Sequence, residues 1–148
     1  EQLLRLSDRA HRGFLLIYAD MDNLKKINDD RGHQEGDRAL KSIADVLKKT
    51  FRNSDIIGRV GGDEFAILAV EAKAESLDAL RKRLHENLEK AACNVESVDK
   101  LTFSLGILYY NPEKSQSIEV LLKSADVLMY EEKRIRSMSS TAHHSPGR

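Results

Sequence analysis

Two glycines and two carboxylates stand together near the middle of the chain, as Gly61, Gly62, Asp63 and Glu64. Apolar runs flank them, which predicts a β-hairpin with strands over 56–60 and 64–70 and a two-residue turn at the glycines. Glycine accepts a positive φ and puts no side chain in the way of a ligand that approaches the backbone. Adjacent carboxylates repel each other unless a cation or a proton offsets their charge. This run therefore indicates a metal site on an open turn.

A second pair of acids, Asp20 and Asp22, follows a continuous apolar run over 14–19. A run that is apolar on both faces predicts a central strand, so these acids are expected at the end of a buried strand. One interpretation of Asp20 is a metal ligand that lies beside the Gly61-Gly62 turn. The alternative is a strand-end acid that caps the following turn.

Hydrophobic spacing predicts the elements that must hold these groups. Helices are expected over 24–30, from about 35 to 51, over 76–93 and over 118–136, and a further strand over 101–110. Residues 1–12 are interpreted as the end of an N-terminal helix truncated from a larger protein, and the polar 137–148 as a disordered tail. This order predicts an α+β fold with a mixed central β-sheet flanked by helices, ferredoxin-like in character.

Composition narrows the function classes. The 148 residues carry 24 basic and 24 acidic side chains, so no global charge attracts nucleic acid or an acidic membrane. The single cysteine excludes an internal disulfide and fits a reducing compartment. The longest apolar stretch is too short to span a bilayer. We expect a cytoplasmic domain without nucleic-acid or direct membrane contact, while a larger parent protein could still be membrane-anchored.

Several separated motifs closely resemble the GGDEF domain of diguanylate cyclases. They cover nearly the whole chain: the run from Asp20 to Asp29, then Gly32, His33, Gly36 and Asp37, the run from Arg59 to Phe65, the strand-like 103–107, and Ala125, Asp126, Tyr130 and Lys133. The resemblance implies a fold of the nucleotidyl-cyclase palm type over 13–136. It also implies an enzyme that joins two GTP molecules into the bacterial second messenger cyclic di-GMP and releases two pyrophosphates.

The resemblance implies a metal and catalytic group. Asp20, Asp63 and Glu64, with the carbonyl of Met21, would hold Mg²⁺ (or Mn²⁺), which prefers oxygen ligands. Asp63 would accept the proton of the attacking 3′-hydroxyl, and Lys25 would stabilise charge in the transition state.

It further implies a guanine site. Asn28 and Asp37 would bind the guanine edge, because a carboxylate accepts hydrogen bonds from N1 and N2 hydrogens that adenine lacks. His33 would shape the loop beside the nucleotide. Structural roles are the alternative: Asn28 ends a helix, Asp37 favours the dipole of the next helix, and a loop histidine is commonly structural.

The implied phosphate contacts come from two helix ends. The first is the backbone of Asn23, Leu24 and Lys25 beside the open turn of Gly61 and Gly62, although the family often has an aromatic residue at position 23. The second is Lys133, with Arg136 as a substitute for the arginine of a glycine, arginine, asparagine run that is missing here. The alternative for Lys133 and Arg136 is a solvated, basic helix end.

Arg52 and Asp55 match the family's inhibitory pattern of arginine, two residues and aspartate, at the expected distance before the glycine turn. The resemblance implies that they bind the product cyclic di-GMP away from the catalytic site. An exposed pair with little effect on stability is the alternative.

The preferred interpretation is an active diguanylate cyclase that works as a homodimer, with one GTP in each half-site and an upstream sensory domain in the parent chain. Two alternatives remain. One is a non-catalytic receptor that binds cyclic di-GMP through Arg52 and Asp55, and the other is a GTP-sensing or dimerising module that regulates an attached domain.

Overall fold

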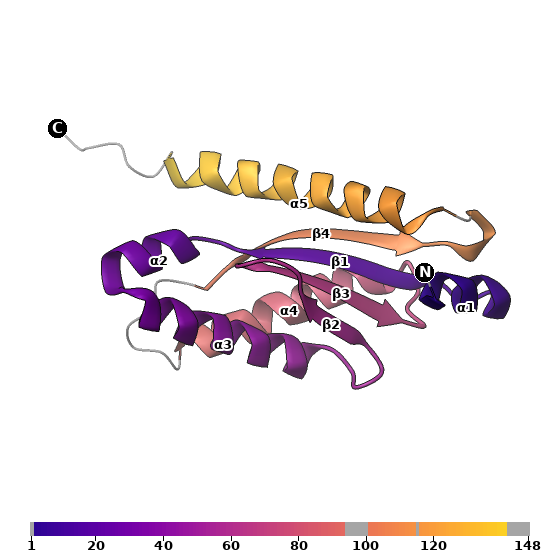
Figure 1. The fold of residues 1–148 in the computed structure, drawn as a ribbon, viewed down its shortest axis with the longest axis horizontal. Helices are drawn as coiled ribbons and strands as arrows, with labels where there is room; N and C mark the ends of the chain where they lie inside the picture. Colours follow the sequence, from indigo (N-terminus) through magenta and orange to yellow (C-terminus); the bar gives the residue numbers. More distant parts are fainter. Residues whose placement is uncertain (1, 94–100, 115, 142–148) are drawn as a thin grey trace.

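The computed structural model describes residues 2–93, 101–114 and 116–141 (Figure 1). The elements follow in the order α1 (Gln2–Ala10), β1 (Phe14–Met21), α2 (Leu24–Arg31), α3 (His33–Thr50), β2 (Ile56–Arg59), β3 (Glu64–Val70), α4 (Ser76–Cys93), β4 (Phe103–Tyr110), the 3₁₀ turn η1 (Pro112–Lys114) and α5 (Ile118–Thr141). None of the helices within these ranges combines the length and apolar character that crossing a bilayer requires.

The four strands form one sheet in the order β2-β3-β1-β4. The predicted α+β class of ferredoxin-like character is confirmed, but the mixed sheet is wrong because all three pairings are antiparallel. The helical crossovers do join strands that run the same way. However, β3 lies between β1 and β2, and β1 lies between β3 and β4, so strands of like direction are never neighbours.

β1 is the central strand that its sequence predicts. Leu15, Ile17 and Ala19 face the core shared with α3 and α4, whereas Phe14 and Leu16 face a second core with α1 and α5. Because successive side chains of a strand point to opposite faces, β1 contributes to both apolar cores, one on each face of the sheet. Figure 1 shows α5 on one side of the sheet and α3 with α4 on the other.

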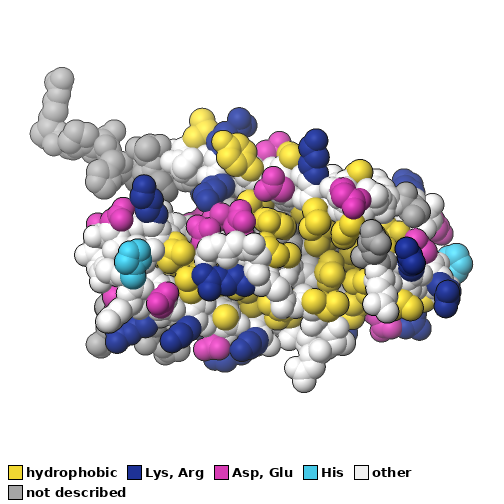
Figure 2. All heavy atoms as spheres, viewed as in Figure 1, with side chains coloured by type: hydrophobic (Ala, Val, Ile, Leu, Met, Phe, Trp, Pro, Cys, Tyr) yellow, Lys and Arg dark blue, Asp and Glu magenta, His cyan; other side chains and the backbone are white. Residues whose placement is uncertain are grey.

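α5 covers only part of its face of the sheet, because it packs against β4 and β1. On the same face of β2 and β3, Ile56 is 52% exposed and its cross-strand partner Leu68 is half-buried. Figure 2 shows hydrophobic side chains gathered on this face below α5.

Two predicted boundaries differ from the structure. α5 continues past Arg136 to Thr141, so the first part of the expected disordered tail is helical, and 142–148 lie outside the described residues. His33 was expected in a loop, but it is the first residue of α3, and the break between α2 and α3 falls at Gly32 with φ of 87°.

Candidate functional site

The pairing of β1 with β3 places the two acidic motifs side by side. Asp20 lies opposite Glu64 in the register, and the Met21 N–H donates to the Asp63 carbonyl at 2.9 Å. The predicted position of Asp20 beside the glycine turn is confirmed. Acids separated by more than forty positions thus meet at one end of the sheet.

Lys133 brings α5 to the same place. Its Nζ donates to Asp20 Oδ1 at 2.7 Å, and the Asp20 side chain is only 8% exposed. Burial raises the pKa of the Asp20 carboxyl, and the charges of Asp63 and Asp22 add to this rise against the effect of Lys133. Burial would lower the pKa of Lys133, but its hydrogen bond to Asp20 and the surrounding acids hold it above its ordinary value.

Within the described ranges, no three His, Cys, Asp or Glu side chains are grouped closely enough to hold a metal. Asp20 instead has the Lys133 ammonium as its cationic partner. The donor chemistry nevertheless fits a hard divalent cation, because Asp20, Asp63 and Glu64 offer oxygen ligands. The position of the Lys133 ammonium also shows where the Asp20 carboxylate stabilises a positive charge. A metal at Asp20 would share it with Lys133 or displace that side chain.

The hairpin tip is stabilised by a residue whose role the sequence did not indicate. Arg59 donates from Nη2 to the Gly62 carbonyl at 2.6 Å and from Nε to the Gly61 carbonyl at 3.2 Å. The turn is a four-residue loop over 60–63, and neither glycine has a positive φ, so the two-residue turn is wrong. A Cβ on Gly61 would lie 2.5 Å from Glu64 Oε2, so a larger residue there would require the Glu64 side chain to move.

The start of α2 leaves its first backbone N–H groups uncapped by a side chain. The preceding Asn23 has φ of 64°, a left-handed conformation that asparagine tolerates better than most residues, and makes no capping hydrogen bond. Leu24 packs partly against the core, while Lys25 is exposed in the first turn. Uncapped N–H groups at a helix start form an anion site.

The predicted guanine-binding residues lie on either side of the corner between α2 and α3. A Cβ on Gly36 would lie 1.9 Å from Asn28 Oδ1, so only glycine lets α3 approach the Asn28 amide. Asp37 follows Gly36 on α3 and is exposed, as is His33. Asn28 therefore lies at the close contact between α2 and α3, and Asp37 is the next residue after the glycine of that contact.

Arg136 also reaches the end of β1. Its Nη1 lies 3.6 Å from Asp22 Oδ2, and its Nη2 lies 3.3 Å from Glu132 Oε1. Arg81 on α4 holds the other oxygen of Glu132. The Arg136 side chain is 38% exposed, so it contacts these acids and also remains accessible to solvent.

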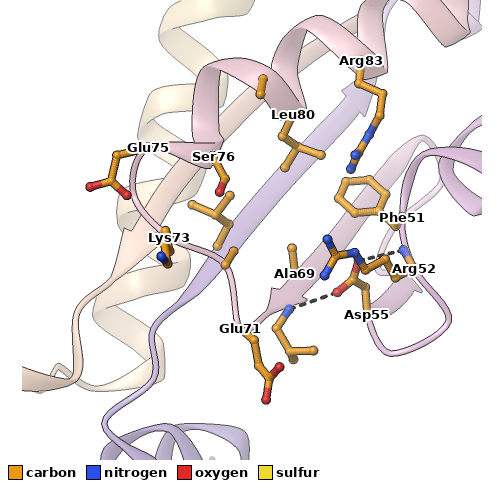
Figure 3. A pocket seen from close by; sticks show the side chains of 14 residues that line it. Phe51, Arg52, Asp55, Ala69, Glu71, Lys73, Glu75, Ser76, Leu80 and Arg83 are labelled. Atoms are coloured by element: carbon orange, nitrogen blue, oxygen red, sulfur yellow. Dashed lines mark hydrogen bonds between the residues drawn. The ribbon is translucent and has the colours of Figure 1, made fainter.

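Arg52 and Asp55 line a separate pocket of about 370 Å³ (Figure 3). It lies near Leu15 and Val70, at the opposite end of β1 and β3 from Asp20. Both Asp55 oxygens accept backbone N–H groups, from Arg52 at 2.8 Å and from Val70 at 3.1 Å. Asp55 thus has a structural role, and Arg52 is exposed.

Figure 3 also shows Arg83 on α4 pointing toward Phe51 and the Arg52 pocket. The sequence indicated no role for this arginine. Its local pattern is that of an ordinary exposed helix position, and only the packing of α4 beside the loop after α3 brings it here.

The chain resembles known proteins over most of its length. The family model described as "Diguanylate cyclase, GGDEF domain" matches residues 1–139. The "Probable diguanylate cyclase DgcC" of Escherichia coli (strain K12) is 39% identical over 126 residues, which are 85% of this chain and 34% of that protein. The chain therefore spans about a third of the length of this curated relative.

Solved structures agree on the fold. The GGDEF domain of PA1120 (TpbB or YfiN) from Pseudomonas aeruginosa (PAO1) is 30% identical with a TM-score of 0.79, over 90% of this chain and 78% of that one. A microbial GGDEF domain described in a novel interaction mode with cyclic di-GMP is 32% identical with a TM-score of 0.73, over 89% and 80% of the two chains.

Proposed function

The chain belongs to the GGDEF domain family of diguanylate cyclases, and from that membership we propose that it condenses two GTP molecules into cyclic di-GMP. In each of two steps a ribose 3′-oxygen forms a bond to an α-phosphorus, the bond from that phosphorus to the pyrophosphate breaks, and the hydroxyl proton leaves to a base. Two pyrophosphates are released for each cyclic product.

The observation that supports this proposal most strongly is the meeting of three segments at one end of the sheet. Asp20 on β1, Glu64 on β3 and Lys133 on α5 converge there, with Asp63 beside them. Transfer of a nucleotidyl group uses carboxylates that bind a divalent cation and cationic side chains that bind the phosphates, and this corner offers side chains of both kinds.

Asp20, Asp63, Glu64 and the Met21 carbonyl would hold Mg²⁺ or Mn²⁺, which neutralises phosphate charge when bound. Asp63 lies half-buried on the partly exposed hairpin loop, where its carboxylate would accept the 3′-hydroxyl proton. The buried Asp20 is held in place by its strand.

The remaining residues orient GTP. The uncapped start of α2, with Lys25, would bind phosphates, as would Lys133 and Arg136 on α5. Asn28 and Asp37 would bind the guanine edge at the corner of α2 and α3, with His33 nearby.

Each domain would bind one GTP, so the two reacting nucleotides meet only in a homodimer. The Arg52 pocket would bind the product and slow the reaction, with Arg83 as a further cation for its phosphates. An upstream sensory domain in the longer parent protein would control the pairing.

The experiment is turnover of GTP with Mg²⁺ by the 148-residue chain, with cyclic di-GMP and pyrophosphate measured together. We expect two pyrophosphates per cyclic product. The variant Asp63→Asn should lose at least about 100-fold in rate, because it removes both a base and a ligand. Asp45→Asn, an exposed acid on α3, is the matched control and should keep full activity.

A coiled coil fused to the chain would enforce a dimer. If this dimer formed no cyclic product at any protein concentration, the proposed enzymatic activity would be contradicted. One observation favours a second candidate, a cyclic di-GMP receptor: the Arg52 pocket is built at the opposite end of the sheet from Asp20 and does not depend on it. Product binding without turnover would support that function instead.

A further inference from the structure

Asp22 follows Asp20 by two residues, yet its side chain is engaged in a different way. Thr102 Oγ1 donates to Asp22 Oδ2 at 2.8 Å, and Ser104 Oγ donates to Asp22 Oδ1 at 2.7 Å. The Asp22 N–H also donates to the Thr102 carbonyl at 3.0 Å. The carboxylate is 12% exposed, and both of its oxygens are occupied by residues at the start of β4. This arrangement is that of a structural anchor.

The same carboxylate faces Arg136. Lys133 and Arg136 lie three positions apart, nearly one turn of α5, and pair with Asp20 and Asp22 respectively. Two ion pairs therefore stand next to each other between α5 and the end of β1. Glu132 contacts Arg136 from within α5 and is held in turn by Arg81 of α4.

We propose that Asp22 is a positioning residue for substrate binding: it holds the guanidinium of Arg136 beside Lys133 and ties the turn before α2 to β4. This inference rests on the proposed function, in which Arg136 touches the phosphates. Asp22 itself touches no substrate. It reduces the freedom of a long, half-exposed side chain before GTP arrives, so less conformational entropy is lost on binding.

The direction in which phosphate affinity changes when the charge of Asp22 is removed distinguishes this positioning role from that of a structural anchor alone. A carboxylate beside a polyphosphate repels it, so removal of the charge of an idle Asp22 would strengthen phosphate binding. If Asp22 positions Arg136, the same removal weakens binding, because the guanidinium loses the acid that ties it to the end of β1, although Glu132 still contacts it.

The test is calorimetry of the 148-residue chain with the α,β-methylene analogue of GTP and with inorganic tripolyphosphate, both with Mg²⁺. Asp22→Asn keeps the size of the side chain and should weaken both probes by about two- to fivefold, the range of a half-exposed ion pair. Arg136→Gln should have an equal or larger effect. The double variant should bind as Arg136→Gln does, because Asp22 acts through that arginine.

Unchanged or tighter binding by Asp22→Asn, or losses that add in the double variant, would overturn the inference. In turnover, Asp22→Asn should raise the KM for GTP and change kcat by less than about twofold, a split that general destabilisation would not give. Should Asp22→Asn fail to fold, Thr102→Val removes one anchor of the carboxylate and should weaken the probes by a smaller factor.

Failure of the proposed function is recognised separately. A wild-type chain that binds the analogue but forms no cyclic product would contradict the enzyme, while the analogue affinities of the variants would still decide the role of Asp22. Asp45→Asn again serves as the control for loss of one negative charge.

Discussion

Asp20 is the residue on which the electrostatics of the site depend most. It is a carboxylate buried at a strand end, surrounded by other acids and neutralised by one ammonium. Removal of one partner from such a pair leaves a charge with neither water nor counter-ion. Lys133 therefore has a role in the free protein besides the phosphate contact proposed for it.

Lys133→Met should destabilise the chain by about 1–2 kcal/mol, a value below that of a fully buried pair because the lysine side chain is 45% exposed. Thermal unfolding measures the loss. Mn²⁺ should raise the midpoint temperature of thermal unfolding more for this variant than for the wild type, because a metal at Asp20 replaces the missing cation.

The exposed Lys123 on α5 provides the control, since Lys123→Met removes the same charge from the same helix. Equal stability of the two variants, or no effect of Mn²⁺ on Lys133→Met, would show that Asp20 does not need this partner.

At the scale of elements, the loop between α3 and β2 is tied to the end of β3. Asp55 makes this tie with both carboxylate oxygens, whereas the neighbouring Arg52 side chain is exposed. The two residues of the proposed product site therefore differ in what they contribute to the fold.

Asp55→Ala should lower the free energy of unfolding by about 1–3 kcal/mol, because it leaves two backbone N–H groups without their acceptor. Arg52→Ala should change it by less than about 0.5 kcal/mol. Both should weaken binding of cyclic di-GMP. Urea unfolding and calorimetry measure the two effects, with the exposed Asn53→Ala as the control in the same loop.

Unaltered product affinity in Arg52→Ala would remove the product site from the proposal. Equal destabilisation by the two substitutions would show instead that Arg52 also holds the loop.

Local sequence patterns predicted these elements well and their long-range contacts poorly. The continuous apolar run before Asp20 predicts a central strand that is buried on both faces. The spacing of the leucines predicts α4 from Ser76 to Cys93, because a helix that buries one face repeats its apolar residues every three or four positions. The antiparallel sheet was missed because strand adjacency depends on segments far apart. The four-residue loop is not predictable from the sequence, because Val60 is apolar and fits a strand pattern, although the structure leaves it 54% exposed.

For the site as well, motifs in the sequence indicate individual residues but not the contacts between distant segments. The resemblance to a family indicated Asp20, Asp63 and Lys133, and the structure brings the first and last into contact. The anchoring of Asp22 by Thr102 and Ser104 spans some eighty positions, and the Arg81–Glu132 pair joins two helices. Each of these side chains alone is an ordinary polar residue, so no local pattern distinguishes them.

At the scale of the whole molecule, the two proposed sites lie at opposite ends of the same strands. The Asp20 end joins β1, β3 and α5, and the Arg52 end joins the loop after α3 with α4. Product bound at one end therefore leaves the other end open, and its inhibition would act on how two domains approach each other.

Specific activity should rise with protein concentration, because two GTP-loaded domains must meet before a bond can form. Rates measured over a hundredfold range of concentration, with cyclic di-GMP removed by a coupled phosphodiesterase, would show this dependence. A constant specific activity over that range would contradict the proposed half-site arrangement. In an enforced dimer, specific activity should no longer depend on protein concentration and should equal the highest value that the free chain reaches.

The central strand has a consequence for synthesis of the chain. β1 is buried on both faces, and its hydrogen-bonding partners, β3 and β4, both come later in the sequence. A ribosome that adds about 5–20 residues per second completes β4 on the order of ten seconds after β1. β3 can pair with one edge of β1 once residue 70 has been made, but the β4 edge stays open for the whole interval, so the nascent chain carries a buried-type apolar strand with at least one unpaired edge.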